Sequence, residues 1–523
     1  MTTITAPTTQ EPSSRRWWTL AVLCLSLLIT VLDTTVVNVA LPTLDRVLHA
    51  SADGLEWIVD AYTLTFAGLL LLGGALGDRY GRHRALPTGL VVFAAGSVLA
   101  AVSGSTGELT AARAIMGAGA ALVMPATLSI LTTIFPNPAE RAKAIAIWSA
   151  VSGLGVAVGP TLGGALLENF SWSSIFLINL PVVLVALIAG ARLVPASRAP
   201  RPPRIDLPGA LLSIAGLSTL TYTLIEAPTV GWTSAHTLAS GLLAVSLLAA
   251  FITTQLRAAD PMVDLRLFTN PRFAGASTSV SVLFFALTGA TFVLTQIYQF
   301  VLSYSPLQAG LRSLPPALMV VVFAPIGERL AARHGARTPI AAGLTLATIG
   351  LVVFATATAG SSWLHYVAAM MIVCVGIGLT MAPATHTIMS SVPPAKAGVG
   401  SAVNDTTRNL GNVLGIAIVG SIVASAYKTT LAPATSHLGH QLAIRTSQSI
   451  GLADQIARHI PAAGGQHLIA AAHHAFIHAA DQGLLIAAAV TITTMILTAP
   501  RLPGRANATT HPTTQTASAT ARA

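Results

Sequence analysis

Apolar runs of about 20 residues recur along the whole chain, separated by short polar segments rich in Arg, Pro and Gly. An α-helix of that length crosses the ~30 Å hydrocarbon core of a bilayer, and we count fourteen such runs. They begin near Trp17, Trp57, Leu86, Glu108, Lys143, Ser174, Pro208, His236, Phe273, Pro306, Thr338, Trp363, Ser401 and Gly483. The pattern predicts an all-α polytopic membrane protein with 14 transmembrane helices. The composition agrees, because 53% of the residues are apolar and only 9% are charged.

The positive charge of the chain follows this topology. A formal net charge of +10 can indicate a nucleic-acid partner, but the 28 Lys and Arg residues are distributed unevenly across the predicted membrane. With a cytoplasmic N-terminus, all but seven lie in cytoplasmic segments, which obeys the positive-inside rule. We therefore expect a bacterial-type inner membrane protein with both termini in the cytoplasm and no nucleic-acid partner.

No motif predicts an enzyme, because the chain has neither a phosphate-binding loop nor a catalytic constellation. Cys24 and Cys374 fall in different spans, which leaves no disulfide framework and no zinc spacing. The long segment 427–480 is rich in Ala and His and could hold a metal. Its alternation of apolar and polar residues instead favours a helix lying along the outer membrane surface, so we expect no metal site and no cofactor.

An internal repeat indicates the architecture. "GGALGDRYGR" at 73–82 and "GERLAARHGA" at 327–336 share Gly, Leu, Arg and Gly in register, and they follow spans two and ten. In two adjacent six-helix halves, equivalent loops would lie six spans apart. These two loops lie eight spans apart, so we expect spans seven and eight to be inserted between the halves. Repeated halves are typical of alternating access.

The repeat and the span pattern together divide the chain into five parts. They predict a cytoplasmic tail at 1–16, a six-helix half at 17–195, a linker with the inserted spans at 196–260, a second six-helix half at 261–500 with an extracytoplasmic loop at 427–480, and a tail at 501–523.

Several motifs resemble the major facilitator superfamily. They are "LDTTVVNVALP" at 32–42, "GALGDRYGRHR" at 74–84, "LTAARAIMGAGAA" at 109–121 and "GLGVAVGPTLGG" at 153–164. The fourteen-span layout is similar to its drug:proton antiporter branch, as are "SWSSIFLINLP" at 171–181 and "GVGSAVNDTTRNLGNVLG" at 398–415. The resemblance covers spans one to thirteen. It implies a monomeric secondary exporter of amphipathic or lipophilic small molecules, such as drugs and antibiotics, in exchange for protons.

Two alternatives stay open. The first is a dedicated exporter of a single metabolite, because substrate-binding cavities are mostly apolar and their sequences do not name the substrate. The second is a transport-inactive membrane sensor or scaffold. A titratable carboxylate inside span one, Asp33, counts against the second alternative because a scaffold would not need it.

The first cytoplasmic loop predicts a conformational latch. Asp78 follows span two, and Arg79 and Arg82 lead towards span three. The carboxylate can pair with an arginine and interact with the N-terminus of a facing helix, which would hold the cytoplasmic side closed. Gly74 and Gly81 favour a tight loop rather than charges that only set the topology.

The second copy of this loop has Ala332 at the position of Asp78. Without a carboxylate at that position, the basic side chain that follows has no equivalent partner. We therefore expect an asymmetric latch in which Arg333 matters less than Arg79.

Span five carries a stripe of small residues. Gly155, Gly159 and Gly163 recur every four residues and let another helix approach closely, and Gly164 extends the stripe. Pro160 removes a backbone hydrogen bond and should bend the helix. Helix packing alone explains such a stripe, but the likeness to the "GP" motif of exporters favours export.

Two charges lie inside spans one and four. A charge near mid-membrane costs at least ~2.5 to 3.5 kcal/mol, so Asp33 and Arg113 are candidates for function. The resemblance implies that spans one and four line the same cavity, so the two side chains could pair. Burial and a nearby cation act on the pKa of a carboxylate in opposite directions, which can place its titration in the working range. We expect this pair to couple transport to protons.

Four further charges are secondary candidates. Asp60 and Glu226 sit near the outer ends of their spans, where a structural role is equally reasonable. Asp405 and Arg408 are three residues apart in the first two turns of span thirteen, and they share a helical face. A gating or structural ion pair is the role we expect for these two.

Overall fold

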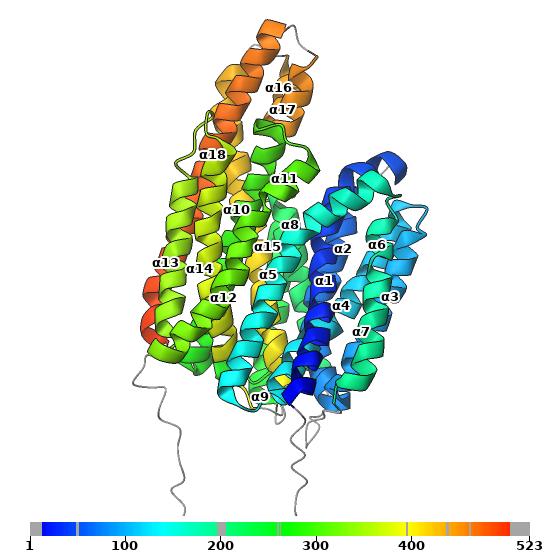
Figure 1. The fold of residues 1–523 in the computed structure, drawn as a ribbon. Helices are drawn as coiled ribbons and strands as arrows, with labels where there is room; N and C mark the ends of the chain where they lie inside the picture. Colours follow the sequence, from blue (N-terminus) through cyan, green and yellow to red (C-terminus); the bar gives the residue numbers. More distant parts are fainter. Residues whose placement is uncertain are drawn as a thin grey trace, which may run out of the picture.

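The computed structural model describes residues 13–48, 52–195, 206–258, 261, 263–393, 396–435, 439–459 and 462–502. Within these ranges the chain is helical and contains no strand (Figure 1). The helices are α1 (Ser13–Leu48), α2 (Ala52–Tyr80), α3 (Arg82–Ala101), α4 (Thr106–Ile134), α5 (Pro138–Asn169), α6 (Ser174–Leu177), α7 (Asn179–Leu193), α8 (Leu207–Val230), α9 (Ala235–Arg257), η1 (Leu265–Thr269), α10 (Pro271–Gln296), η2 (Ile297–Val301), α11 (Pro306–Arg312), α12 (Leu314–His334), α13 (Arg337–Phe354), α14 (Trp363–Ser390), α15 (Ala397–Thr435), α16 (His440–Gln448), α17 (Ile450–Ala457), α18 (Ala462–Thr498) and η4 (Ala499–Arg501). Residues 1–12 and 503–523 of the predicted tails and residues 196–205 of the predicted linker lie outside the described ranges.

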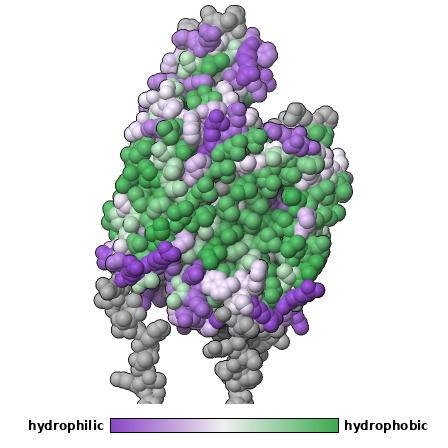
Figure 2. All heavy atoms as spheres, in the orientation of Figure 1, coloured by the Kyte–Doolittle hydropathy of each residue, from purple (hydrophilic) through white to green (hydrophobic). Residues whose placement is uncertain are grey.

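Fourteen helical stretches are long and apolar enough to cross a membrane, so the predicted fold class and number of spans are confirmed. On the face seen in Figure 2, apolar side chains form a broad band across the middle of the molecule, with polar side chains gathered above and below it. Helix α1 begins and α18 ends at the same end of the molecule, the end predicted to be cytoplasmic (Figure 1). The helix that contains span thirteen begins at Ala397, before Ser401, and the helix that contains span fourteen begins at Ala462, well before Gly483.

The opposite end carries a helical projection built from α15, α16, α17 and α18 (Figure 1). The prediction of a helix lying along the outer membrane surface is wrong, because α18 runs without a break from Ala462 to Thr498. The large apolar side chains in the predicted surface segment of this helix, residues 466–483, are largely buried against other helices. Leu468 and Phe476 are buried, and the ring of Phe476 lies 6.2 Å from that of Tyr427 on α15. The amphipathic pattern therefore reflects packing between helices.

The two copies of the loop motif form equivalent turns. Gly81 directly follows α2 with φ of 105°, and Gly335 directly follows α12 with φ of 84°. Only glycine adopts such angles without strain, so the shared glycine ends the helix in both copies. The alignment of the repeat is thus matched by the backbone.

A second glycine of the repeat sets the distance between helices. A Cβ on Gly73 of α2 would collide with the carbonyl oxygen of Ala121 on α4. A Cβ on Gly327 of α12 would collide with the carbonyl oxygen of Leu379 on α14 in the same way. The pairs α2 with α4 and α12 with α14 are therefore packed at backbone contact in both halves.

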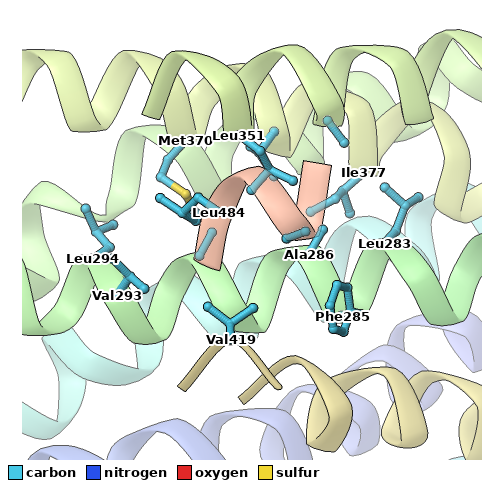
Figure 3. Packing of buried hydrophobic residues seen from close by; sticks show 14 of the residues in the cluster. Leu283, Phe285, Ala286, Val293, Leu294, Leu351, Met370, Ile377, Val419 and Leu484 are labelled. Carbon is cyan, nitrogen blue, oxygen red and sulfur yellow. The ribbon is translucent and has the colours of Figure 1, made fainter. Parts of the chain in front are cut away.

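Buried apolar side chains form two large clusters. One is built mainly from α1 to α7 and includes Leu23, Phe93 and Leu128. The other is built mainly from α10 to α18, and Figure 3 shows part of it, with Leu351 and Leu484 facing each other across the helices. Each half thus has its own core, although the residue boundaries given above for the halves stay a prediction.

The inserted helices lie beside the halves. Helix α8 packs against α2, α9 and α15, whereas many apolar side chains of α9 are exposed towards the lipid. A Cβ on Gly68 of α2 would collide with the hydroxyl of Ser218 on α8. On its other side, Leu224 of α8 shares a small apolar cluster with Val413 and Ala417 of α15. Helix α8 therefore contacts both halves.

The topology is tested by single cysteines in a background without Cys24 and Cys374. Ser105, Ser303 and Ala139 are exposed, and the first two lie on the predicted outer side. We expect cysteines at Ser105 and Ser303 to react in intact cells with an impermeant thiol reagent, and one at Ala139 to react only after the membrane is opened. Labelling of Ala139→Cys in intact cells would contradict the fourteen-span map.

Candidate functional site

Asp33 on α1 and Arg113 on α4 come together inside the N-terminal half, as the sequence suggested. Nη1 of Arg113 donates to Oδ2 of Asp33, and Nε of Arg113 donates to the carbonyl oxygen of Ile58 at 3.2 Å. Asp33 is 2% exposed and Arg113 is 1% exposed. Removing one partner of a buried ion pair lowers the stability of a folded protein by about 3 to 5 kcal/mol. The two side chains therefore hold α1 and α4 in register.

Two further side chains complete the surroundings of this pair. Nδ2 of Asn179 on α7 donates to Oδ1 of Asp33 at 3.3 Å and to Oγ of Ser97 on α3 at 3.0 Å. The guanidinium of Arg113 lies 4.4 Å from the centre of the Tyr62 ring on α2. Both carboxylate oxygens thus have a donor, and the arginine has a cation–π partner.

Sequence reasoning missed Asn179 and Tyr62. Asn179 falls inside the quoted stretch 171–181, so its motif carried the signal, but that motif gave no indication of which helix the amide faces. Tyr62 had no signal of its own, because an aromatic residue in an apolar span usually serves only packing.

The cytoplasmic loop joins the two halves at a second carboxylate, Asp78, which is fully buried at the end of α2. Its Oδ1 accepts from Nη2 of Arg82 at 2.8 Å and from the backbone N–H of Gly398 at 2.9 Å. Its Oδ2 accepts from the N–H of Val399 at 3.1 Å. Gly398 and Val399 lie in the first turn of α15, whose free N–H groups and positive dipole end favour an anion.

The remaining predicted latch residues differ in what they contact. A Cβ on Gly74 would lie 2.5 Å from the carbonyl oxygen of Gly398, so glycine at this position lets α2 touch α15. Arg82 also donates to Oγ1 of Thr133 on α4 at 2.6 Å. The guanidinium of Arg79 lies instead 5.6 Å from the ring centre of Tyr80. We use the name latch for Asp78, Arg82 and the first turn of α15, residues 397–399.

The second half has its own carboxylate near the equivalent loop, and sequence reasoning missed it. Oε1 of Glu328 on α12 lies 2.9 Å from Nδ1 of His386 on α14. Glu328 is buried and stands one turn before Ala332, the position that corresponds to Asp78. The repeat carried the signal, because Glu328 falls within its second copy. This pair joins two helices of one half, so it does not reproduce the contact of Asp78 with α15.

Asp405 and Arg408 lie deeper than predicted. Because α15 begins at Ala397, the two residues fall in its third and fourth turns rather than in the first two. Nη1 of Arg408 lies 3.6 Å from Oδ1 of Asp405, and Nη2 of Arg408 donates to Oγ of Ser152 on α5 at 3.0 Å. Both charges are buried, and the arginine reaches from the C-terminal half to the N-terminal half.

Asp60 and Glu226 are less enclosed than these pairs. Both are half-buried, Asp60 on α2 and Glu226 towards the end of α8. One stacked aromatic pair links the same two helices, with the rings of Trp57 and Tyr222 centred 6.3 Å apart. The sequence left a structural and a functional role equally open for these two carboxylates, and that choice stays a prediction.

The glycine stripe of α5 faces α1. Side chains at these glycines would collide with or press on three residues of α1, namely Val31, Thr35 and Val36. At the end of the stripe, Gly164 faces Leu307 of α11, and Pro160 lies within an unbroken α5 against Gly310. The stripe therefore lets α5 pack closely against α1 in the N-terminal half and against α11.

Comparisons with known proteins identify relatives of the chain. A family model described as Major Facilitator Superfamily matches residues 23–416. The chain is 36% identical to the "Multidrug resistance protein Stp" of Mycobacterium tuberculosis over 409 residues, which cover 78% of this chain and 76% of that protein. It is 35% identical to the "Multidrug efflux pump LfrA" of Mycolicibacterium smegmatis over 472 residues, covering 90% and 93%. The crystal structure of the human organic anion transporter MFSD10 superimposes with a TM-score of 0.63 at 15% identity and covers 93% of this chain and 100% of that chain, which shows a common fold.

The latch contacts generate one prediction. Asp78→Asn removes the charge that binds both Arg82 and the first turn of α15, and charged hydrogen bonds of this kind contribute about 1.5 to 3 kcal/mol each. We expect Asp78→Asn to lower turnover of a transported dye about tenfold at unchanged protein level in the membrane, and Ala332→Asp to lower it much less. Equal turnover of Asp78→Asn and the wild type would contradict the latch and show that the charges of this loop only set the membrane topology.

Proposed function

Because the chain belongs to the Major Facilitator Superfamily, as its motifs indicated, we propose that it exports amphipathic or lipophilic small molecules, including drugs and antibiotics, in exchange for protons. The chain is a membrane transporter and not an enzyme. Export of drugs is supported by the names of Stp and LfrA, which align with most of this chain. Both termini lie in the cytoplasm of a bacterial inner membrane, and the protein works as a monomer without a cofactor.

Asp33 carries the proton in this proposal. The supporting observation is a buried carboxylate held by a donor on each oxygen, Arg113 on one and Asn179 on the other. Protonation of Asp33 weakens both contacts at once and frees the arginine to interact elsewhere. A proton and a bound substrate can therefore compete for one small cluster of polar groups.

The latch supports the alternating-access part of the proposal. In the present conformation the N-terminal and C-terminal halves touch through Asp78 and the first turn of α15. Access from the cytoplasm requires this contact to break while the rest of each half stays packed around its own core. Loading and release then occur on opposite sides of the membrane.

The energy of one proton suffices for useful export. A charge that moves through ~100 mV gains about 2.3 kcal/mol, and half a pH unit adds about 0.7 kcal/mol. The total of about 3 kcal/mol corresponds to roughly a hundredfold substrate gradient.

Replacement of the proposed proton carrier tests the coupling. Asp33→Asn keeps the size and hydrogen-bonding capacity of the side chain but cannot titrate. We expect purified Asp33→Asn protein in liposomes to bind a neutral substrate and to lose accumulation driven by an imposed pH gradient. Asp454→Asn is the matched control, because its ion pair with Arg458 lies in the projection and is largely exposed at the arginine.

Uphill transport by Asp33→Asn at the wild-type rate would place the proton carrier elsewhere. Asp60 and Asp405 would then be the next carboxylates to replace. Loss of transport in Asp454→Asn as well would show that carboxylate replacement acts through folding rather than through coupling.

A further inference from the structure

A groove lies between α3 and α7 at the end of the molecule predicted to be cytoplasmic. The two helices pack side by side (Figure 1), and α3 begins at this end while α7 ends there. Pro87 and Leu90 of α3 line one wall, and Gly190 and Ala191 of α7 line the other. The groove has a volume of about 230 Å³, and none of the functional residues described above contributes to it.

A small residue of α7 leaves part of this space open. A Cβ on Gly190 would meet only Cγ1 of Val22 at 3.7 Å and Cγ2 of Val194 at 3.9 Å, which is ordinary van der Waals contact. At Gly73, in contrast, a Cβ would collide with the backbone of α4. The glycine of α7 therefore does not serve close helix packing, and the space beside it can take up additional atoms.

The groove lies on a surface that faces the hydrocarbon of the membrane. Val91 on α3 is 54% exposed, and Leu184 and Ile188 on α7 are 57% and 51% exposed. Both helices belong to predicted membrane spans, so lipid chains cover these side chains. The occupant that these surroundings supply to an apolar groove is an acyl chain.

Basic side chains stand at the cytoplasmic end of the groove. His83 belongs to its lining, and the exposed Arg84 follows directly on α3. The exposed Arg192 follows Ala191 on α7, and Nη2 of Arg15 on α1 donates to the carbonyl oxygen of Arg192 at 2.9 Å. Within the part of the chain that the structure describes, no carboxylate pairs with Arg84 or Arg192.

We propose that this groove binds one anionic phospholipid of the cytoplasmic leaflet, with an acyl chain between α3 and α7 and the phosphate on Arg84 and Arg192. Basic pockets between transmembrane helices on the cytoplasmic side are suited to anionic headgroups. A guanidinium donates two parallel hydrogen bonds to a phosphate, which favours arginine at such a site. The headgroup of a zwitterionic lipid such as phosphatidylcholine brings a cation towards the same arginines, so it binds less tightly.

Native mass spectrometry of the purified full-length protein tests the site without requiring transport. The probes are dioleoyl phosphatidylglycerol, which is anionic, and dioleoyl phosphatidylcholine, which has the same chains. We expect the wild type to retain one phosphatidylglycerol molecule with a dissociation constant about tenfold lower than that of phosphatidylcholine. Arg84→Gln combined with Arg192→Gln should raise the dissociation constant of phosphatidylglycerol about tenfold and leave that of phosphatidylcholine nearly unchanged. Glycerol phosphate, which lacks the chains, should not bind in the same concentration range.

A variant of the groove itself tests the place of the acyl chain. Gly190→Leu fills the space beside α7, and we expect it to weaken binding of both lipids about fivefold. Two matched controls should bind both lipids as the wild type does. Arg337→Gln removes an exposed arginine at the start of α13, and Val185→Phe adds volume to α7 on the lipid-facing side outside the lining.

Equal affinity of the wild type for the two lipids would overturn the proposal. Unchanged binding of phosphatidylglycerol in either the arginine double variant or folded Gly190→Leu would do the same. If Gly190→Leu does not elute as a folded protein on size exclusion, the arginine variant decides, because both arginines are exposed. A wild-type dimer that becomes a monomer in Gly190→Leu would assign the groove to a second copy of the chain and would also overturn the proposal.

Discussion

A charge inside a membrane needs a partner, and the pair of Asp33 and Arg113 shows how much structure that need imposes. The arginine also contacts the carbonyl of Ile58, and the carboxylate also contacts Asn179, which in turn contacts Ser97. Helices α1, α2, α3, α4 and α7 therefore converge on one buried cluster. Loss of a partner would leave a charge in a low dielectric, so the arrangement of this half depends on the cluster.

The ion pairs described above each lie within one half. When the halves separate, Asp78 keeps Arg82 and loses only backbone N–H groups of α15, which water can then solvate. In the same way Arg408 keeps Asp405 and loses two uncharged partners on α5, the hydroxyl of Ser152 and the ring of Trp148. Opening thus exposes neutral hydrogen-bonding groups and leaves no charge without its partner, which keeps the energy difference between conformations small.

Sequence patterns predicted the features that depend on the length of apolar runs and on the local preferences of single residues. The spans follow from apolar run length, and the turns at Gly81 and Gly335 follow from the repeat. Patterns did not predict contacts that depend on helix rotation and on the partner helix. Asn179 facing Asp33 is one example, and the pairing of Glu328 with another helix is a second. The first part of α18 was predicted to lie along the membrane surface, because an amphipathic pattern is the same whether lipid or protein covers its apolar face.

The contacts of α8, one of the two inserted helices, restrict how the two halves can move relative to each other. It touches α2 at Gly68 and α15 near Val413 and Ala417, and these two helices belong to different halves. A relative rotation of the halves cannot leave both contacts unchanged, so α8 must travel with one half and slide along the other, a shear rather than a hinge. The face of α8 towards α15 is apolar at Leu224. If α8 travels with α2, lipid chains can fill the space that it vacates beside α15, and the bilayer itself becomes part of the moving interface.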